Sequence, residues 1–124
     1  MANRDQRKHP RVRTSNLISF KLYDDTGRLL NQSMARALNI SQSGILIEAA
    51  HLIKSDRISL MSVDTGDRLV EIKGRVVYSR DNGTGMYETG ISFEGSAEEN
   101  IDFAKKLVKV FHRRKNGLLM AVNQ

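Results

Sequence analysis

The sequence predicts a mainly β protein that ends in a single α-helix, and three observations carry this prediction. Apolar and polar residues alternate with a period of two in several segments, which is typical of strands with one buried face. Turn-forming clusters, such as residues 24–27 and 82–83, separate these segments. From Ser96 onward the apolar residues recur at helical spacing instead. About six antiparallel strands followed by a helix indicate a small barrel or sandwich, closed by that helix, in one domain of 124 residues.

The first two strands are expected to form a hairpin. Residues 16–23 alternate cleanly, and the apolar face of this strand carries Ile18, Phe20 and Leu22. A second strand is expected over residues 29–38. Its pattern is poorer, because Gln32 and Arg36 share the face of the large apolar side chains. Those side chains are Leu30, Met34 and Leu38.

Four more strands are expected after this hairpin. Two short ones cover residues 44–48 and 58–63, and the longest alternation spans residues 68–80. Asn82 and Gly83 then give a strong hairpin signal. The strand that returns from this hairpin has one face formed by Tyr87, Thr89, Ile91 and Phe93.

The helix has a recognisable start. Ser96 and Glu99 form a capping-box pattern, and acids in the first turn and bases in the last suit the helix dipole. The apolar residues at helical spacing are Ile101, Ala104, Leu107, Val108 and Phe111. The expected division of the chain is an arm, a barrel, a helix and an uncharged tail over residues 1–14, 15–95, 96–115 and 116–124.

Positive charge is concentrated at the two ends of the chain. The formal net charge is +6. Five Lys/Arg against Asp5 give residues 1–13 a net of +4, and six against three acids give residues 96–115 a net of +3. The remainder has nine basic and ten acidic residues, a net of −1. A nucleic-acid binder more often carries a basic stripe over its body, so we do not expect nucleic acid as the partner.

Composition and motifs favour a protein without catalytic or metal sites. The chain has no cysteine, and His9, His51 and His112 have no carboxylate or second histidine at ligand spacing. No catalytic or phosphate-loop motif is present. The longest apolar run, residues 118–122, is too short to span a bilayer, and no secretory signal is found. We therefore expect a cytoplasmic protein that is not an enzyme and needs no metal ion or cofactor.

A basic arm precedes the first strand. Arg7, Lys8 and Arg11 surround the only proline of the chain, Pro10, which makes a helix unfavourable here. Two guanidinium groups four residues apart are suited to gripping an anion. Taken alone, such an arm is more often a solvated tail.

A polar ledge is expected between the second and third strands, where Asn39, Ser41 and Gly44 follow one another in an N-x-S-x-x-G pattern. The asparagine amide offers a donor and an acceptor, the serine a hydroxyl, and the glycine room for a flat ring. Arginine can bind phosphate oxygens bidentately and can also bind O6 and N7 of guanine. A ligand that combines guanines with phosphates would therefore use the arm and the ledge together.

R-x-x-x-R in the arm, followed some thirty residues later by N-x-S-x-x-G, resembles the PilZ family. Residues 74–78 and 88–93 are also similar to that family's late strands, and the resemblance covers roughly residues 4–111. It implies a six-stranded antiparallel barrel and a bacterial receptor for the second messenger cyclic di-GMP.

The resemblance also implies roles for single residues. Arg7 and Arg11 would hold phosphates and guanine edges as the arm wraps the ligand. Asn39 and Ser41 would bond a guanine from the barrel surface, and Gly44 would allow its close approach.

Three further residues could contribute to this site. Lys8 and Arg13 are additional cations of the arm. Many family members carry another arginine where this chain has Gln6, and Arg4 and Arg13 could compensate for it. Tyr78 falls where members often have an aromatic residue that stacks on a base, but its parity with the apolar residues of its strand favours a core position.

The leading hypothesis is a stand-alone cyclic di-GMP receptor that acts as an adaptor. Its arm would become ordered over the ligand and so change a surface that an effector protein reads. A PilZ-fold module that acts through protein contacts without ligand is the first alternative. A barrel that binds single-stranded nucleic acid is less favoured, because only seven aromatic residues are present and they are not clustered.

Overall fold

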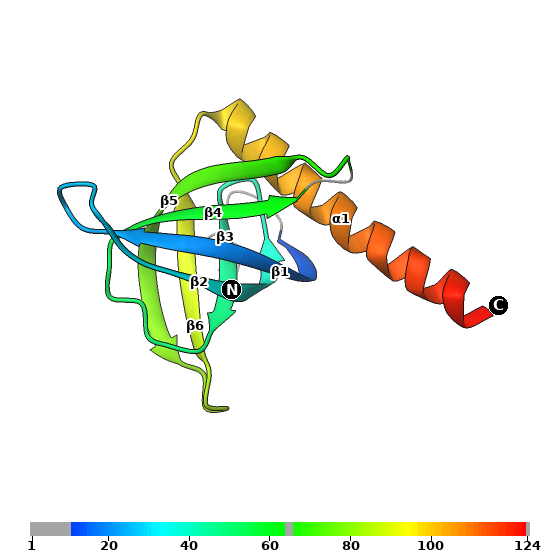
Figure 1. Cartoon of the computed structure of the whole chain (residues 1–124), viewed down its shortest axis with the longest axis horizontal. Coiled ribbons are helices and arrows are strands. Elements are labelled where there is room, and N and C mark those ends of the chain that lie inside the picture. Colours follow the sequence, from blue (N-terminus) through cyan, green and yellow to red (C-terminus); the bar gives the residue numbers. More distant parts are fainter. Residues whose placement is uncertain (1–10, 64–65, 124) are drawn as a thin grey trace, which may run out of the picture.

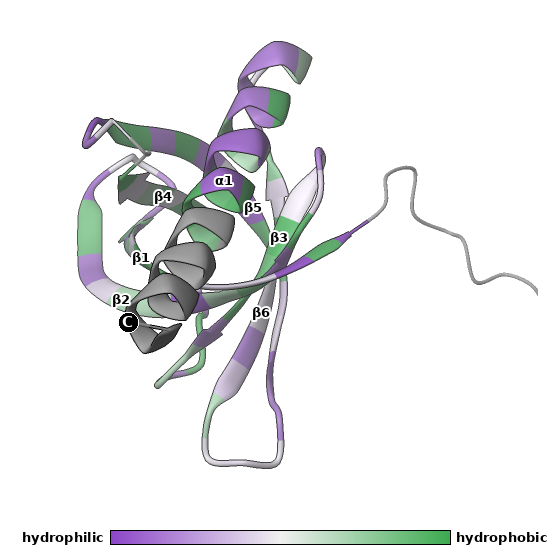
Figure 2. Cartoon of the chain, turned by 90° about the vertical axis from the view of Figure 1, so that its right-hand side faces the viewer, coloured by the Kyte–Doolittle hydropathy of each residue, from purple (hydrophilic) through white to green (hydrophobic). Residues whose placement is uncertain are grey.

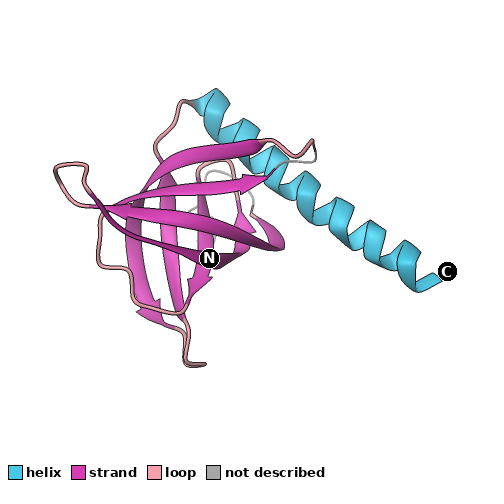
Figure 3. Cartoon of the chain, in the orientation of Figure 1, coloured by secondary structure: helices cyan, strands magenta, loops and turns pink. Residues whose placement is uncertain are grey.

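Six strands close into an antiparallel barrel, and one helix packs against it (Figure 1). The computed structural model describes residues 11–63 and 66–123, with side chains as far as Phe111. The elements are β1 (Val12–Tyr23), β2 (Leu29–Ile40), β3 (Gly44–Ala49), β4 (Arg57–Val63), β5 (Leu69–Asp81), β6 (Tyr87–Phe93) and α1 (Ala97–Asn123). Neighbouring strands follow the order β1-β2-β3-β6-β5-β4, and β4 closes the barrel on β1. The predicted fold class is confirmed (Figure 3).

Alternate residues of the strands fill the interior of the barrel. Figure 2 shows hydrophobic and hydrophilic positions interspersed along the strands. Two predicted faces are confirmed as buried: Ile18, Phe20 and Leu22 on β1, and Thr89, Ile91 and Phe93 on β6. Full burial of each large apolar side chain contributes about 1.5–3 kcal/mol, so these alternating faces hold the wall together.

Along most of β2 the buried face is formed by small residues, and the one large side chain buried there is Ile40 at the end of the strand. Ala35 and Ala37 face the interior, whereas Leu30 and Met34 are 56% and 55% exposed. Ala35 lies directly opposite Ile18 of β1. Small barrels combine large and small side chains because their interior is narrow, so a methyl group is sufficient beside an isoleucine. Leu30 and Met34 of β2 therefore lie on the outer face.

The helix begins where the capping box predicted. The backbone N–H of Ser96 donates to Oε1 of Glu99 (2.7 Å), and the N–H of Glu99 donates to Oγ of Ser96 (3.1 Å). The buried face of the helix is formed by Phe103, Ala104, Leu107 and Val110. Phe103 meets Phe93 of β6 edge-on, with ring centroids 5.6 Å apart.

The end of the helix differs from the prediction. It runs to Asn123 instead of ending at Lys115, so the basic residues 113–115 do not form its last turn. Residues 118–122 are mostly good helix formers, and the one interrupting residue, Gly117, costs only about 1 kcal/mol relative to alanine. Helix propensity therefore continues through the segment that the sequence suggested as a tail.

A buried asparagine ties the helix to the barrel. Asn16 of β1 is 1% exposed, and its Nδ2 donates to the backbone oxygen of Leu107 (2.8 Å). Its Oδ1 has no hydrogen-bond partner among the described residues. A buried amide in this position fixes which part of α1 lies over β1.

Candidate functional site

Three strands carry a β-bulge at the same level of the barrel wall. The register shifts lie between Arg13 and Asn16 on β1, between Ala37 and Asn39 on β2, and between Val76 and Tyr78 on β5. A bulge inserts one extra residue and changes the direction of the side chains that follow. Because bulges are common next to binding and active sites, this level of the wall is the candidate site.

The bulges place five residues side by side across five strands. Arg13, Asn39, Leu46, Gly90 and Tyr78 are successive cross-strand partners, and we call this set the bulge row. The next row of partners includes Ile40, Ile45 and Ile91, which are all buried in the interior, so the bulge row lies on the outer face. With strands about 4.8 Å apart, roughly 10 Å separates Asn39 from Gly90.

Arg11 contacts one end of the bulge row. Its Nη1 donates to Oδ1 of Asn39 at 2.6 Å, across 28 residues of sequence. The next cation, Arg13, pairs with Asn39 in the strand register. The structure thus brings together two arginines of the arm and the asparagine of the ledge. Arg7 and Lys8 lie outside the described residues.

Ser41 and Gly44 build the turn that supports this ledge. The hydroxyl of Ser41, 6% exposed, accepts hydrogen bonds from the backbone N–H groups of Ser43 and Gly44, both at 3.2 Å. The N–H of Ser41 donates to the Gly44 oxygen at 2.9 Å. A Cβ on Gly44 would collide with the backbone oxygen of Ile91 on β6. The motif therefore holds β2, β3 and β6 close together, and half-buried Asn39 is its most accessible member.

Tyr78 is not a core residue, so the prediction from parity is wrong. It is 40% exposed, because the extra residue of the bulge, Val77, reverses the alternation along β5. Ser79 now faces inward, and its hydroxyl lies 2.8 Å from that of Thr89. The ring of Tyr78 packs against Gly90, where an added Cβ would meet the ring. An aromatic surface is therefore available at the other end of the bulge row.

A row of four charged residues runs beside the bulge row. Arg36, Glu48, Glu88 and Arg80 are successive cross-strand partners. Arg36 Nη2 lies 3.6 Å from Glu48 Oε1, and Arg80 Nη2 lies 3.7 Å from Glu88 Oε1. We call this set the charge row. It has no sequence motif, since its members become neighbours only through the strand register.

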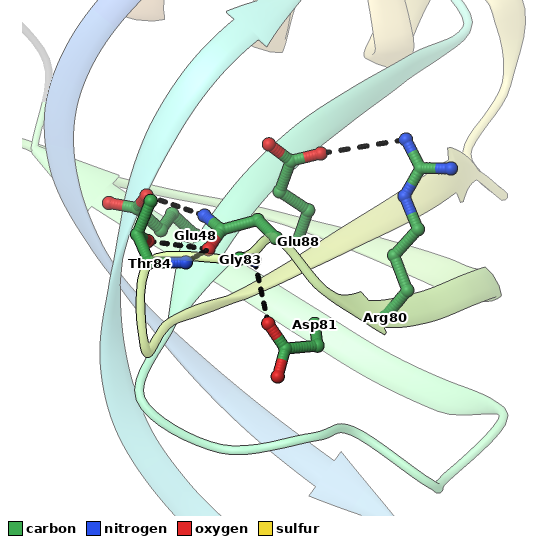
Figure 4. Close-up of polar contacts among 7 residues, drawn as sticks. Glu48, Arg80, Asp81, Gly83, Thr84 and Glu88 are labelled. Atoms are coloured by element: carbon green, nitrogen blue, oxygen red, sulfur yellow. Dashed lines mark hydrogen bonds and ion pairs between the residues drawn. The ribbon is translucent and has the colours of Figure 1, made fainter.

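The β5–β6 hairpin fixes one member of the charge row (Figure 4). Nδ2 of Asn82 donates to Oε2 of Glu48 at 3.0 Å. Its Oδ1 accepts from the backbone N–H of Thr84, and Asp81 accepts from the N–H of Gly83. Asn82, which signals the hairpin in the sequence, therefore also positions the Glu48 carboxylate next to the candidate site.

A cleft of about 590 Å³ opens away from the bulge row, between β1, β4 and β5. Its lining includes three bases, Arg57, Lys73 and Arg75, and four acids, Asp25, Asp56, Glu71 and Glu94. Opposite charges nearly balance there, so this cleft has no strong preference for an anion. The bulge row, although open, has the better chemistry for one.

The described residues place two further limits on the site. Among them, no three His, Asp or Glu side chains gather closely enough to hold a metal ion. No helix in the described part of the chain has the length and apolar character needed to cross a bilayer.

An open polar surface on a closed barrel, with arginines at one end and an aromatic ring at the other, is typical of a binding module. The sequence matches the PilZ domain family over residues 5–109. This chain therefore belongs to the PilZ domain family. A comparison with curated proteins found no match.

Solved structures share the fold. The Bacillus subtilis inhibitor of motility (MotI/DgrA) is 15% identical with a TM-score of 0.53, over 94% of this chain and 57% of that one. The K. pneumonia MrkH–c-di-GMP complex is 15% identical with a TM-score of 0.52, over 96% and 55%. The PilZ domain of Escherichia coli YcgR with c-di-GMP is 9% identical with a TM-score of 0.51, over 97% and 99%. The chain thus spans little more than half the length of the first two.

Proposed function

We propose that this chain is a receptor for cyclic di-GMP, which binds on the bulge row beneath the N-terminal arm. The observation that carries the proposal is the hydrogen bond between Arg11 and Asn39. It joins the two halves of the family motif, which are distant in sequence, at one exposed place on the barrel wall. Two neighbouring structures support the same ligand, since MrkH and YcgR are described as complexes with c-di-GMP.

The chemistry of the bulge row fits this ligand. The guanidinium groups of Arg11 and Arg13 suit phosphate oxygens and the O6 and N7 atoms of guanine. The amide of Asn39 adds a donor and an acceptor for a base edge. Half-buried Leu46 lies between the asparagine and Gly90, and the ring of Tyr78 packs over Gly90. A base on this row would have polar contacts at one end and an aromatic surface at the other.

The remaining motif residues have supporting roles in this proposal. Ser41 and Gly44 hold the turn in place, and direct contact between the Ser41 hydroxyl and a guanine would need the turn bonds to rearrange. Arg7 and Lys8 complete the arm by resemblance to the family. We propose that the protein works in the cytoplasm, without catalysis, and that the liganded arm is read by an effector protein.

Isothermal titration calorimetry with cyclic di-GMP tests the proposal. A charge-assisted hydrogen bond is worth about 1.5–3 kcal/mol, so Arg11→Ala should weaken binding at least about tenfold, and Asn39→Ala should also weaken it. Arg28→Ala is the matched control, because Arg28 is an exposed arginine in the turn at the opposite end of the β1–β2 hairpin. The proposal would be refuted if the wild type did not bind cyclic di-GMP, or if the control variant lost as much affinity as the two site variants.

A further inference from the structure

Arg80 covers part of the aromatic surface of the bulge row. Its Cζ lies over the ring of Tyr78, 5.1 Å from the centroid. The two residues are two positions apart on the outer face of β5, after the bulge. A base that approaches Tyr78 from this side therefore meets the guanidinium of Arg80 first.

The position of Arg80 is held from the neighbouring strand. Glu88 is its cross-strand partner, with Oε1 3.7 Å from Nη2, and Figure 4 shows the two side chains pointing toward each other. Glu88 in turn stands opposite Glu48, which interacts with Arg36 and Asn82. Like charges directly opposite each other on a sheet are destabilising, so Glu88 favours a cation at the position of Arg80.

We propose that Arg80 is a base-stacking residue of the proposed ligand site: its guanidinium, backed by Tyr78 and held by Glu88, is the plane on which a guanine stacks. This inference rests on the proposed function. A guanidinium is flat and weakly hydrated, so it can stack on an aromatic ring and on a base at the same time. The result is a three-layer stack of base, guanidinium and phenol ring at the end of the bulge row opposite Arg11.

Charge alone would not give Arg80 this role. The two arginines and two glutamates of the charge row balance, so the row as a whole offers an anionic ligand no net attraction. Lysine at position 80 would keep the charge and lose the plane. Arg80→Lys therefore separates stacking from electrostatics.

The test is calorimetry with cyclic di-GMP on four proteins: the wild type, Arg80→Lys, Arg80→Ala and the double variant Arg80→Ala/Glu88→Gln. Loss of the stacked guanidinium plane should weaken binding about fivefold or more in both single variants. The double variant should still bind cyclic di-GMP weakly, because it restores the charge balance without restoring the guanidinium plane. Arg28→Ala again serves as the control, and circular dichroism verifies that each variant is folded.

Three results would overturn the inference. Binding by Arg80→Lys at the wild-type level would mean that only the charge matters, and recovery in the double variant would mean that Arg80 only neutralises Glu88. Unchanged binding in Arg80→Ala, while Arg11→Ala is weakened, would remove the role of Arg80 and leave the proposed function standing. If the wild type itself does not bind, the proposed function fails and the inference fails with it.

Discussion

Replacing Gly44 by alanine separates the two explanations for the glycine of the family motif. One is that it leaves room for a ligand, and the other is that it lets β3 approach β6. An added Cβ would collide with the backbone oxygen of Ile91 and would lie 3.6 Å from Cα of Ser92. The Ser92 contact is an ordinary one, but the Ile91 oxygen is a backbone atom, so no side-chain rotation relieves that clash, and the strands must separate.

The cost of Gly44→Ala follows from this geometry. Overpacking typically costs about 1–3 kcal/mol, and we expect the upper end because the backbone must move. A domain of this size is stable by about 5–15 kcal/mol, so a loss of about 3 kcal/mol should lower the melting temperature by roughly 10 °C. Thermal unfolding without ligand, followed by far-ultraviolet circular dichroism, measures this shift.

Gly90→Ala is the matched comparison. Its added Cβ would meet the ring of Tyr78, which is exposed and can rotate away, so the expected loss is below about 1 kcal/mol. The packing explanation would be refuted if the melting temperature of Gly44→Ala equalled that of the wild type, or was no lower than that of Gly90→Ala. If such a protein also lost its ligand, the glycine would serve the ligand instead.

Two other substitutions test the supports of the site. Asn16→Asp places a carboxylate against the Leu107 oxygen at a position that is 1% exposed, and this environment raises the folded-state pKa of the new carboxyl group. We expect the variant to lose about 3–5 kcal/mol of unfolding free energy at neutral pH, and this loss should shrink as the pH falls through the raised pKa toward about 4. Urea denaturation at several pH values measures the loss. A deficit independent of pH would contradict the contact. Ser41→Ala leaves the buried N–H of Gly44 without its side-chain partner and should cost about 1–2 kcal/mol in the same assay, whereas a stable variant that binds ligand poorly would assign Ser41 to the ligand.

The parts of the fold that depend on local sequence were predictable. The alternation in β1 and β6 and the capping box of α1 depend on residues close together in the chain, and the structure confirms them. Which side chains of β2 are buried, and whether Tyr78 is buried or exposed, could not be predicted from local sequence. It depends on what lies opposite: Ile18 beside Ala35, and a bulge in β5 relative to β6.

The candidate site was predictable to the same extent. The pairing of Arg11 with Asn39 could be expected because both belong to a motif with fixed spacing. The charge row could not, because Glu48 and Glu88 belong to strands 40 residues apart in sequence that become neighbours only when the barrel closes. Burial of the Ser41 hydroxyl in its own turn was also not visible as a motif.

The attachment of the arm to the barrel makes its two motif arginines unequal. Thr14 is fixed to β2 through a hydrogen bond from its hydroxyl to the Ala37 oxygen (2.9 Å), and Asn16 is fixed to α1. Arg11 is three residues from this anchor, a tether of at most about 10 Å, whereas Arg7 is seven residues away, at most about 25 Å. The effective concentration of Arg11 at Asn39 is therefore high in the protein without ligand, where the two side chains are already hydrogen-bonded.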